Sequence, residues 1–194
     1  MDCCAHRPWT AATVALLAGL SATACAQPPA APQGLLQPSD LQQLEVVDAQ
    51  VETPIGSVTR CEAVRDPHRE LLGDGDFYRY DVKTDDDLAG TVWTGAYRPD
   101  ADDVDTLWDY LPTTPTECPD IRRVEADRAM AAGAAEAAGL DPIDVQVYNA
   151  SGYGTRAYAL VDDRVVVVAT SHDLTLDVDL PQLVATAVER SSGT

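Results

Sequence analysis

The chain has 194 residues, of which 45% are apolar, so it is long enough for one domain with a buried core after a leader is removed. Its 32 acidic residues against 13 basic ones give a formal net charge of −19. A surface this acidic repels nucleic acid and anionic headgroups, so we expect no nucleic-acid partner, whereas basic partners and divalent cations are not excluded.

Residues 1–24 are predicted to be an export signal. His6 and Arg7 give a weakly basic start, and Trp9 to Leu20 form a short apolar stretch followed by small residues. The stretch is too short for a membrane-spanning helix, which needs about 20 apolar residues. The sequence therefore predicts an exported protein.

Two cleavage sites fit the end of this leader. The small residues 22–24 precede Cys25, as in a lipoprotein signal that makes this cysteine the new, lipidated N-terminus. The bacterial lipobox usually has Leu three residues before the cysteine, and this chain has Ala22 there. The alternative is ordinary small-x-small cleavage after Ala26, which would release a secreted chain that begins at Gln27.

The number and positions of the five cysteines favour lipidation of Cys25. Cys3 and Cys4 lie in the leader, and Cys61 and Cys118 are predicted to form a disulfide, because such bonds persist in exported proteins. Closing that loop would stabilise the fold by about 4 kcal/mol. An unpaired cysteine in an exported protein requires an explanation, and thioether attachment of a lipid to Cys25 would provide one.

The predicted domain organisation follows. Residues 1–24 are a lipoprotein signal peptide, and residues 25–34 carry the lipid and a Pro/Ala-rich tether. Residues 35–194 form one extracytoplasmic domain. We therefore expect attachment to the outer face of the cell membrane, with a secreted protein as the alternative.

The first part of the domain is predicted to contain a short helix and several strands. Ser39 is placed to cap the helix. Candidate strands are Val46–Glu52 and Ser57–Val64, and alternation indicates a hairpin of Phe77–Thr84 with Gly90–Arg98.

The second part is predicted to be helices and a three-stranded meander. Helical spacing favours Asp102–Leu111, and an Ala-rich run favours a helix over Arg122–Ala138. Three strands follow, in "IDVQVYNA", "TRAYALV" and "RVVVVATS", and Val165–Val168 is apolar on both faces, as in a central strand. "DLPQLVATAVER" is an amphipathic helix. The sequence thus predicts an α+β domain, an antiparallel sheet with helices packed on it.

No catalytic or metal site is predicted. The chain has no Gly-x-Ser-x-Gly elbow, and His68 and His172 fall in charged loops. Two isolated cysteines are too few ligands for zinc, and the acidic stretch at Asp100 and Asp102 lacks the Gly and Glu of a calcium loop. We expect no cofactor.

Four aromatic residues of the predicted hairpin, Tyr78, Tyr80, Trp93 and Tyr97, are candidates for a ligand-facing surface. Core packing is the role that we expect for them, and a ligand- or partner-facing surface is the alternative.

The leader ending at Cys25, "GLLQPSDL", "AGTVWTGAY" and "RAYALVDDRVVVVAT" together resemble a broad group of actinobacterial secreted lipoproteins. That group includes the extracellular sensor domains of mycobacterial serine/threonine kinases. The resemblance implies an extracytoplasmic α+β domain with a ligand-binding cleft and no catalytic residues. The expected partners are the membrane, through the lipid, and a small ligand or an envelope protein; the alternatives are a cell-envelope hydrolase with a dispersed site and an accessory subunit of an envelope complex.

Overall fold

A computed structural model describes residues 30–41, 43–51, 75–99, 105–106, 108, 124–150, 154–174 and 178–193. Seven strands in these ranges form one sheet in the order β1-β2-β3-β7-β6-β5-β4, and every neighbouring pair is antiparallel. The described part is therefore an α+β fold, as predicted.

The strands are β1 (Glu45–Val51), β2 (Gly75–Lys83), β3 (Ala89–Tyr97), β4 (Val124–Ala126), β5 (Val145–Ala150), β6 (Gly154–Val161) and β7 (Arg164–Thr170). The α-helices whose full length lies within the described residues are α3 (Arg128–Ala138) and α4 (Leu180–Ser192). Short 3₁₀ helices are η1 (Pro38–Asp40), η3 (Pro142–Asp144) and η4 (His172–Leu174).

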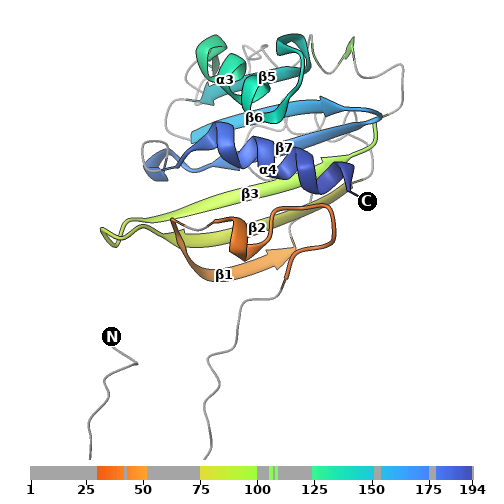
Figure 1. Cartoon of the computed structure of the whole chain (residues 1–194). Helices are drawn as coiled ribbons and strands as arrows, with labels where there is room; N and C mark the ends of the chain where they lie inside the picture. Colours follow the sequence, from red (N-terminus) through yellow and green to blue (C-terminus); the bar gives the residue numbers. More distant parts are fainter. Residues whose placement is uncertain are drawn as a thin grey trace, which may run out of the picture.

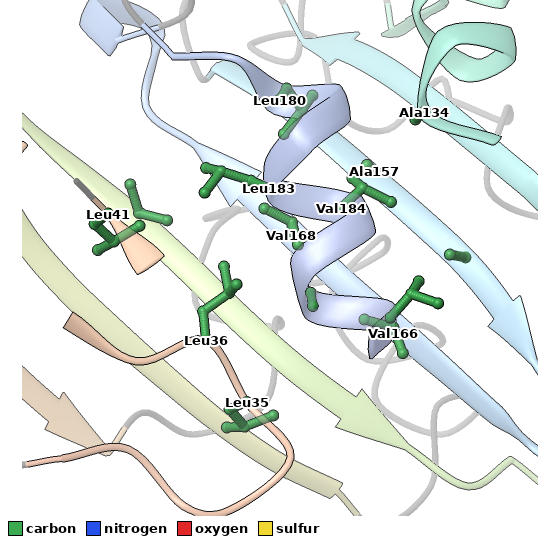
Figure 2. Packing of buried hydrophobic residues seen from close by; sticks show 14 of the residues in the cluster. Leu35, Leu36, Leu41, Ala134, Ala157, Val166, Val168, Leu180, Leu183 and Val184 are labelled. Carbon is green, nitrogen blue, oxygen red and sulfur yellow. The ribbon is translucent and has the colours of Figure 1, made fainter. Parts of the chain in front are cut away.

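Both α-helices lie on one face of the sheet, with α4 next to β7 and β6 and α3 next to β5 (Figure 1). The N-terminal segment, residues 31–41 and 43–44, lies beside α4 on the same face and covers β2 and β3 (Figure 1). Apolar side chains from these three elements and from the strands beneath them form the larger core. Figure 2 shows Leu36 and Leu41 of the N-terminal segment facing the same interior as Leu183 and Val184 of α4.

Strand β7 occupies the middle of the sheet, and its residues Val165 to Thr170 are all buried. Val166 and Val168 face the helices, whereas Val165 and Val167 belong to a second core on the opposite face. The prediction of a central strand covered on both sides is confirmed. Its unbroken run of valines is the reason, because both faces of the strand meet apolar neighbours.

The second core is largely aromatic. Phe77, Tyr97, Tyr148 and Tyr158 are buried on the face away from the helices. Trp108 packs against them, and its indole N–H donates to the carbonyl of Ile143 at 3.1 Å. Asp105, Thr106 and Trp108 are helical, and the rest of the helix predicted over Asp102–Leu111 lies outside the described residues.

The prediction of one helix over Arg122–Ala138 is wrong at its beginning. Val124–Ala126 instead forms β4, paired with β5, and the helix begins at Arg128. The Asp127 carboxylate accepts a hydrogen bond from the Met130 N–H at 3.0 Å, so this aspartate caps the helix. A cap at Asp127 explains why the residues before it are free to pair as a strand.

Ser39 is not a helix cap, because it lies inside η1. Gln37 takes the capping position, and its backbone N–H donates to the Asp40 carboxylate at 2.7 Å. The remaining predicted elements agree within a few residues with β1, β2, β3, β5, β6, β7 and α4. The strand predicted at Ser57–Val64 lies outside the described residues.

Candidate functional site

The N-terminal segment is held on the sheet by buried leucines and by polar side chains. Leu35 and Leu36 are almost fully buried. The Leu36 N–H donates to the Thr94 hydroxyl at 3.4 Å, and the Leu36 carbonyl accepts from the Tyr80 hydroxyl at 2.6 Å. Ala31 is already buried, so packing of the domain begins before the predicted boundary at residue 35.

An ion pair joins this segment to the last turn of α4. Arg190 donates to both carboxylate oxygens of Asp40, through Nε at 2.5 Å and through its terminal nitrogen at 2.6 Å. Asp40 is about 10% exposed and Arg190 about 37%. The hydrogen bond to Asp40 raises the pKa of the Arg190 guanidinium, against the opposing effect of burial. Such a two-pronged arginine contact fixes orientation as well as distance.

Two neighbouring hollows follow α4 where it meets the N-terminal segment, and we call them together the α4 groove. The first measures about 320 Å³ and is lined by Asp40, Leu41, Gln43, Leu44, Val178, Asp179, Gln182, Leu183 and Thr186. The second measures about 430 Å³ and is lined by Gln33, Gly34, Asp40, Thr186, Glu189, Arg190 and Gly193. Asp40 and Thr186 line both hollows, so the ion pair stands where they meet.

The groove mixes apolar and polar walls. Leucines and a valine line the first hollow beside two carboxylates, two side-chain amides and a hydroxyl. Asp179 also caps α4, because its carboxylate accepts from the Gln182 N–H at 3.1 Å. The second hollow is more polar and contains the one guanidinium of the groove, Arg190. Apolar walls with a few placed polar groups are typical of small-ligand sites, which measure several hundred Å³.

The four predicted ligand-facing aromatics do not share one surface. Tyr78 and Tyr80 belong to the core beneath the helices, and Trp93 and Tyr97 lie on the opposite face. The pairing of β2 with β3 gives the reason, since Tyr78 lies opposite Thr94 while Trp93 lies opposite Arg79. Tyr78, Tyr80 and Tyr97 are at most 3% exposed, so they pack in the core.

The remaining sites predicted from the sequence fall outside this groove. Cys25, Cys61 and Cys118, the lipid and disulfide residues, lie outside the described residues, as does His68. His172 is exposed in η4 and lines none of the hollows described above. Within the described ranges, no three His, Cys, Asp or Glu side chains gather in an arrangement that could hold a metal ion.

The Asp40–Arg190 ion pair, which lies where the two hollows meet, was not predicted from the sequence. Asp40 and Arg190 are 150 positions apart, and no local spacing links them. The sequence held only a general signal, because an arginine in the last turn of a helix interacts favourably with the negative end of the helix dipole. Nothing in the sequence indicated which carboxylate it meets.

A cluster of hydrogen-bonded polar side chains at the start of α3 has a structural role. The Asn149 amide donates to Asp127 at 3.1 Å, and its oxygen accepts from the Thr155 hydroxyl at 2.6 Å. These bonds connect the β5–β6 hairpin to the start of α3. Thr155 is 1% exposed, so the cluster satisfies buried polar groups.

No protein-family model, no curated protein and no solved structure matches the chain. Neither α3 nor α4, the α-helices of the described ranges, has the length and apolar character needed to cross a membrane.

Proposed function

We propose that the protein is a lipid-anchored extracytoplasmic domain that binds a small ligand, or a short segment of an envelope partner, in the α4 groove. The groove is the observation that carries this proposal. It has the size and mixed lining of a binding site. One of its walls is the N-terminal segment, which continues directly toward Cys25.

The sequence supports the anchored half of the proposal. Cys25 follows a short apolar leader and three small residues, and lipidation there leaves Cys61 and Cys118 as a pair. A diacylglycerol thioether carries two acyl chains, which is sufficient for stable membrane attachment, unlike one chain. The resemblance to secreted lipoproteins points in the same direction.

Fractionation of cells that produce the full chain tests the anchor. We expect the protein in the membrane fraction, and we expect Cys25→Ser to move it to the soluble fraction or the medium. A control variant, Ser192→Cys, keeps Cys25 and should stay with the membrane. Wild-type protein already free in the medium would show that the anchor assignment is wrong.

A ligand screen with a blocked groove tests the binding function. Thr186 lines both hollows, and its hydroxyl donates within α4 to the Gln182 carbonyl at 2.9 Å, so Thr186→Trp should fill the groove at small cost to folding. Envelope metabolites and envelope peptides are screened by chemical-shift perturbation of the domain. A ligand that shifts residues of the groove should lose affinity in Thr186→Trp.

The matched control is Glu136→Trp, which puts the same bulky side chain on an exposed position of α3. It should leave binding unchanged. Binding that survives Thr186→Trp would place the site elsewhere. Turnover of a substrate at a site outside the groove would favour the envelope hydrolase instead.

A further inference from the structure

The sheet has two ends, and the N-terminal segment enters the domain at one of them. At one end lie the β6–β7 turn and the last turn of α4, which are joined by a hydrogen bond from the Arg164 guanidinium to the Ser191 carbonyl at 3.2 Å. Gln33 and Gly34 of the N-terminal segment lie there too, because they line the same hollow as Gly193. We call this the tether end. It is the end of α4 marked C in Figure 1.

The opposite end carries the β2–β3 turn, and we call it the acidic end. Asp85, Asp86 and Asp87 are consecutive and exposed in this turn. Lys83 approaches Asp87 at 4.0 Å, which leaves a local excess of negative charge. Strand β2 has nine residues, so it separates the two ends by about 30 Å.

Arginines gather at the tether end. Arg98 and Arg164 both approach Asp163, at 3.8 and 4.0 Å, and Arg190 binds Asp40. Asp76 and Asp162 are also exposed at this end, and Glu189 lines its hollow, so the arginines offset only part of its negative charge. The entry of the N-terminal segment, and not a neutral charge, is therefore what distinguishes this end from the other.

The chain between Cys25 and the domain is short. Ala31 is buried, and its carbonyl accepts from the Gln37 side chain at 3.2 Å, so this residue is packed against the domain. The six residue steps from Cys25 span at most about 20 Å even when fully extended. This reach is less than the length of β2.

We propose that the tether end faces the lipid headgroups, so that the second hollow of the α4 groove opens toward the bilayer and the Asp85–Asp87 turn points away from it. The proposal rests on the lipid anchor at Cys25. The short chain holds the tether end close to the bilayer, and anionic headgroups oppose the approach of the exposed Asp85–Asp87 turn. A ligand of this hollow must then be reachable at the membrane surface.

Site-specific quenching tests this orientation. The lipidated full chain is placed in vesicles of phosphatidylcholine with a minority of phosphatidylglycerol, and some headgroups carry a nitroxide. A fluorescent amino acid is introduced at Ser192 at the tether end or at Asp86 in the acidic turn, both of which are exposed. We expect a larger fractional loss of fluorescence at Ser192 than at Asp86.

A third position tests whether the whole end of the sheet, and not α4 alone, faces the headgroups. Ile143 is 75% exposed and precedes Val145, which pairs with Ala159 near the β6–β7 turn, so Ile143 also lies at the tether end. It should be quenched more than Asp86, and quenching no greater than at Asp86 would contradict the orientation. Vesicle flotation in the same samples reports the anchor independently.

Equal quenching at Ser192 and Asp86 in protein that floats with vesicles would overturn the orientation while leaving the anchor in place. Protein that does not float would overturn the anchor and the orientation together. Lengthening the tether with a Gly/Ser insert after Ala26 should reduce quenching at Ser192, whereas unchanged quenching would contradict the proposed role of tether length.

Discussion

The face of the sheet beneath the helices is covered in two different ways. Over β5, β6 and β7 the cover is α-helical, with the buried side chains of α3 and α4. Over β2 and β3 the cover is the N-terminal segment, which has one short 3₁₀ helix and no α-helix within its described residues. Both covers bury leucines completely or nearly so.

The difference shows what an irregular cover requires. A helix satisfies most of its own backbone groups, whereas an extended segment on an apolar core must find other partners for them. Here Thr94 and Tyr80 bond the two backbone groups of Leu36. The Gln37 side chain donates to the carbonyls of Ala31, Pro32 and Leu35 at 3.1 to 3.3 Å. Side chains thus satisfy the backbone donors and acceptors of this segment, whereas in α4 the backbone groups mostly satisfy one another.

The first prediction, which has the largest expected effect, asks whether the N-terminal segment contributes as much as α4 to the free energy of unfolding. Leu36 is 0% exposed, so Leu36→Ala should lower the free energy of unfolding by about 3 kcal/mol, as should Leu183→Ala in α4. Urea denaturation measures both. Leu88→Ala is the control, because this leucine is half exposed in the β2–β3 turn and its truncation should cost little. A near-neutral Leu36→Ala would mean that the N-terminal segment is not part of the cooperative fold.

The second prediction concerns alkaline pH. Burial raises the pKa of Tyr148 from 10.0 to about 12, and the nearby Tyr158 adds to the shift. Above pH 10 the unfolded chain releases this proton while the folded chain keeps it, so the unfolded state binds fewer protons and stability falls as pH rises. The loss should reach roughly 2 kcal/mol by pH 12. Stability below pH 10 should not depend on this titration.

Variants of two tyrosines compare this titration in the second core, which contains Tyr148, with titration beneath the N-terminal segment, where Tyr80 is buried. Tyr148→Phe should flatten the loss of stability between pH 10 and pH 12 in denaturation curves. The pKa of Tyr80 is also raised, first by burial and then by Tyr78 and Asp40. Tyr80→Phe should reduce the same slope but should also destabilise at neutral pH, because the Leu36 carbonyl loses its donor. A Tyr148→Phe variant with an unchanged alkaline slope would contradict the assignment.

The third prediction concerns the Asp40–Arg190 ion pair, which joins the N-terminal segment to α4. Asp40→Asn removes the negative charge that faces Arg190 in a partly buried position, and it should cost about 1.5 kcal/mol. The control is Asp81→Asn, which breaks the more exposed pair with Arg79, where the cost should stay below about 1 kcal/mol. Thermal denaturation compares the two. Equal costs would show that the Asp40–Arg190 pair behaves as an ordinary surface pair.

Regular elements with strong periodicity could be predicted from the sequence. The β2–β3 hairpin follows from strict alternation, and the valine run in β7 follows from a strand with two covered faces. Helix α4 follows from its apolar stripe. In each case the signal lies within the element itself, so neighbours in sequence are sufficient to reveal it.

Features that depend on distant partners could not be predicted. The N-terminal segment has no period, and its place on β2 and β3 depends on Thr94 and Tyr80. Alternation placed Tyr80 and Trp93 within strands but could not set the register that divides them between two faces. The α4 groove exists because an irregular segment and a helix from opposite ends of the chain lie side by side.

The smallest predicted effect compares two helix caps. Asp127 caps α3 and also accepts a hydrogen bond from the Asn149 amide, whereas the Asp179 carboxylate accepts the cap bond from the Gln182 N–H. Each truncation to alanine should cost about 1 kcal/mol through the cap alone. Asp127→Ala should cost more than Asp179→Ala by the additional bond, since it leaves the Asn149 amide without its carboxylate.

A double-mutant cycle resolves that difference. If the bond to Asn149 carries the excess, Asn149→Ala should cost less in the Asp127→Ala background than in the wild type. If the costs of Asp127→Ala and Asn149→Ala are additive, the larger cost of Asp127→Ala comes from α3 itself. In that case the β5–β6 hairpin would be held independently of the helix, and the helical cover would be less dependent on side-chain bonds than the N-terminal segment beside it.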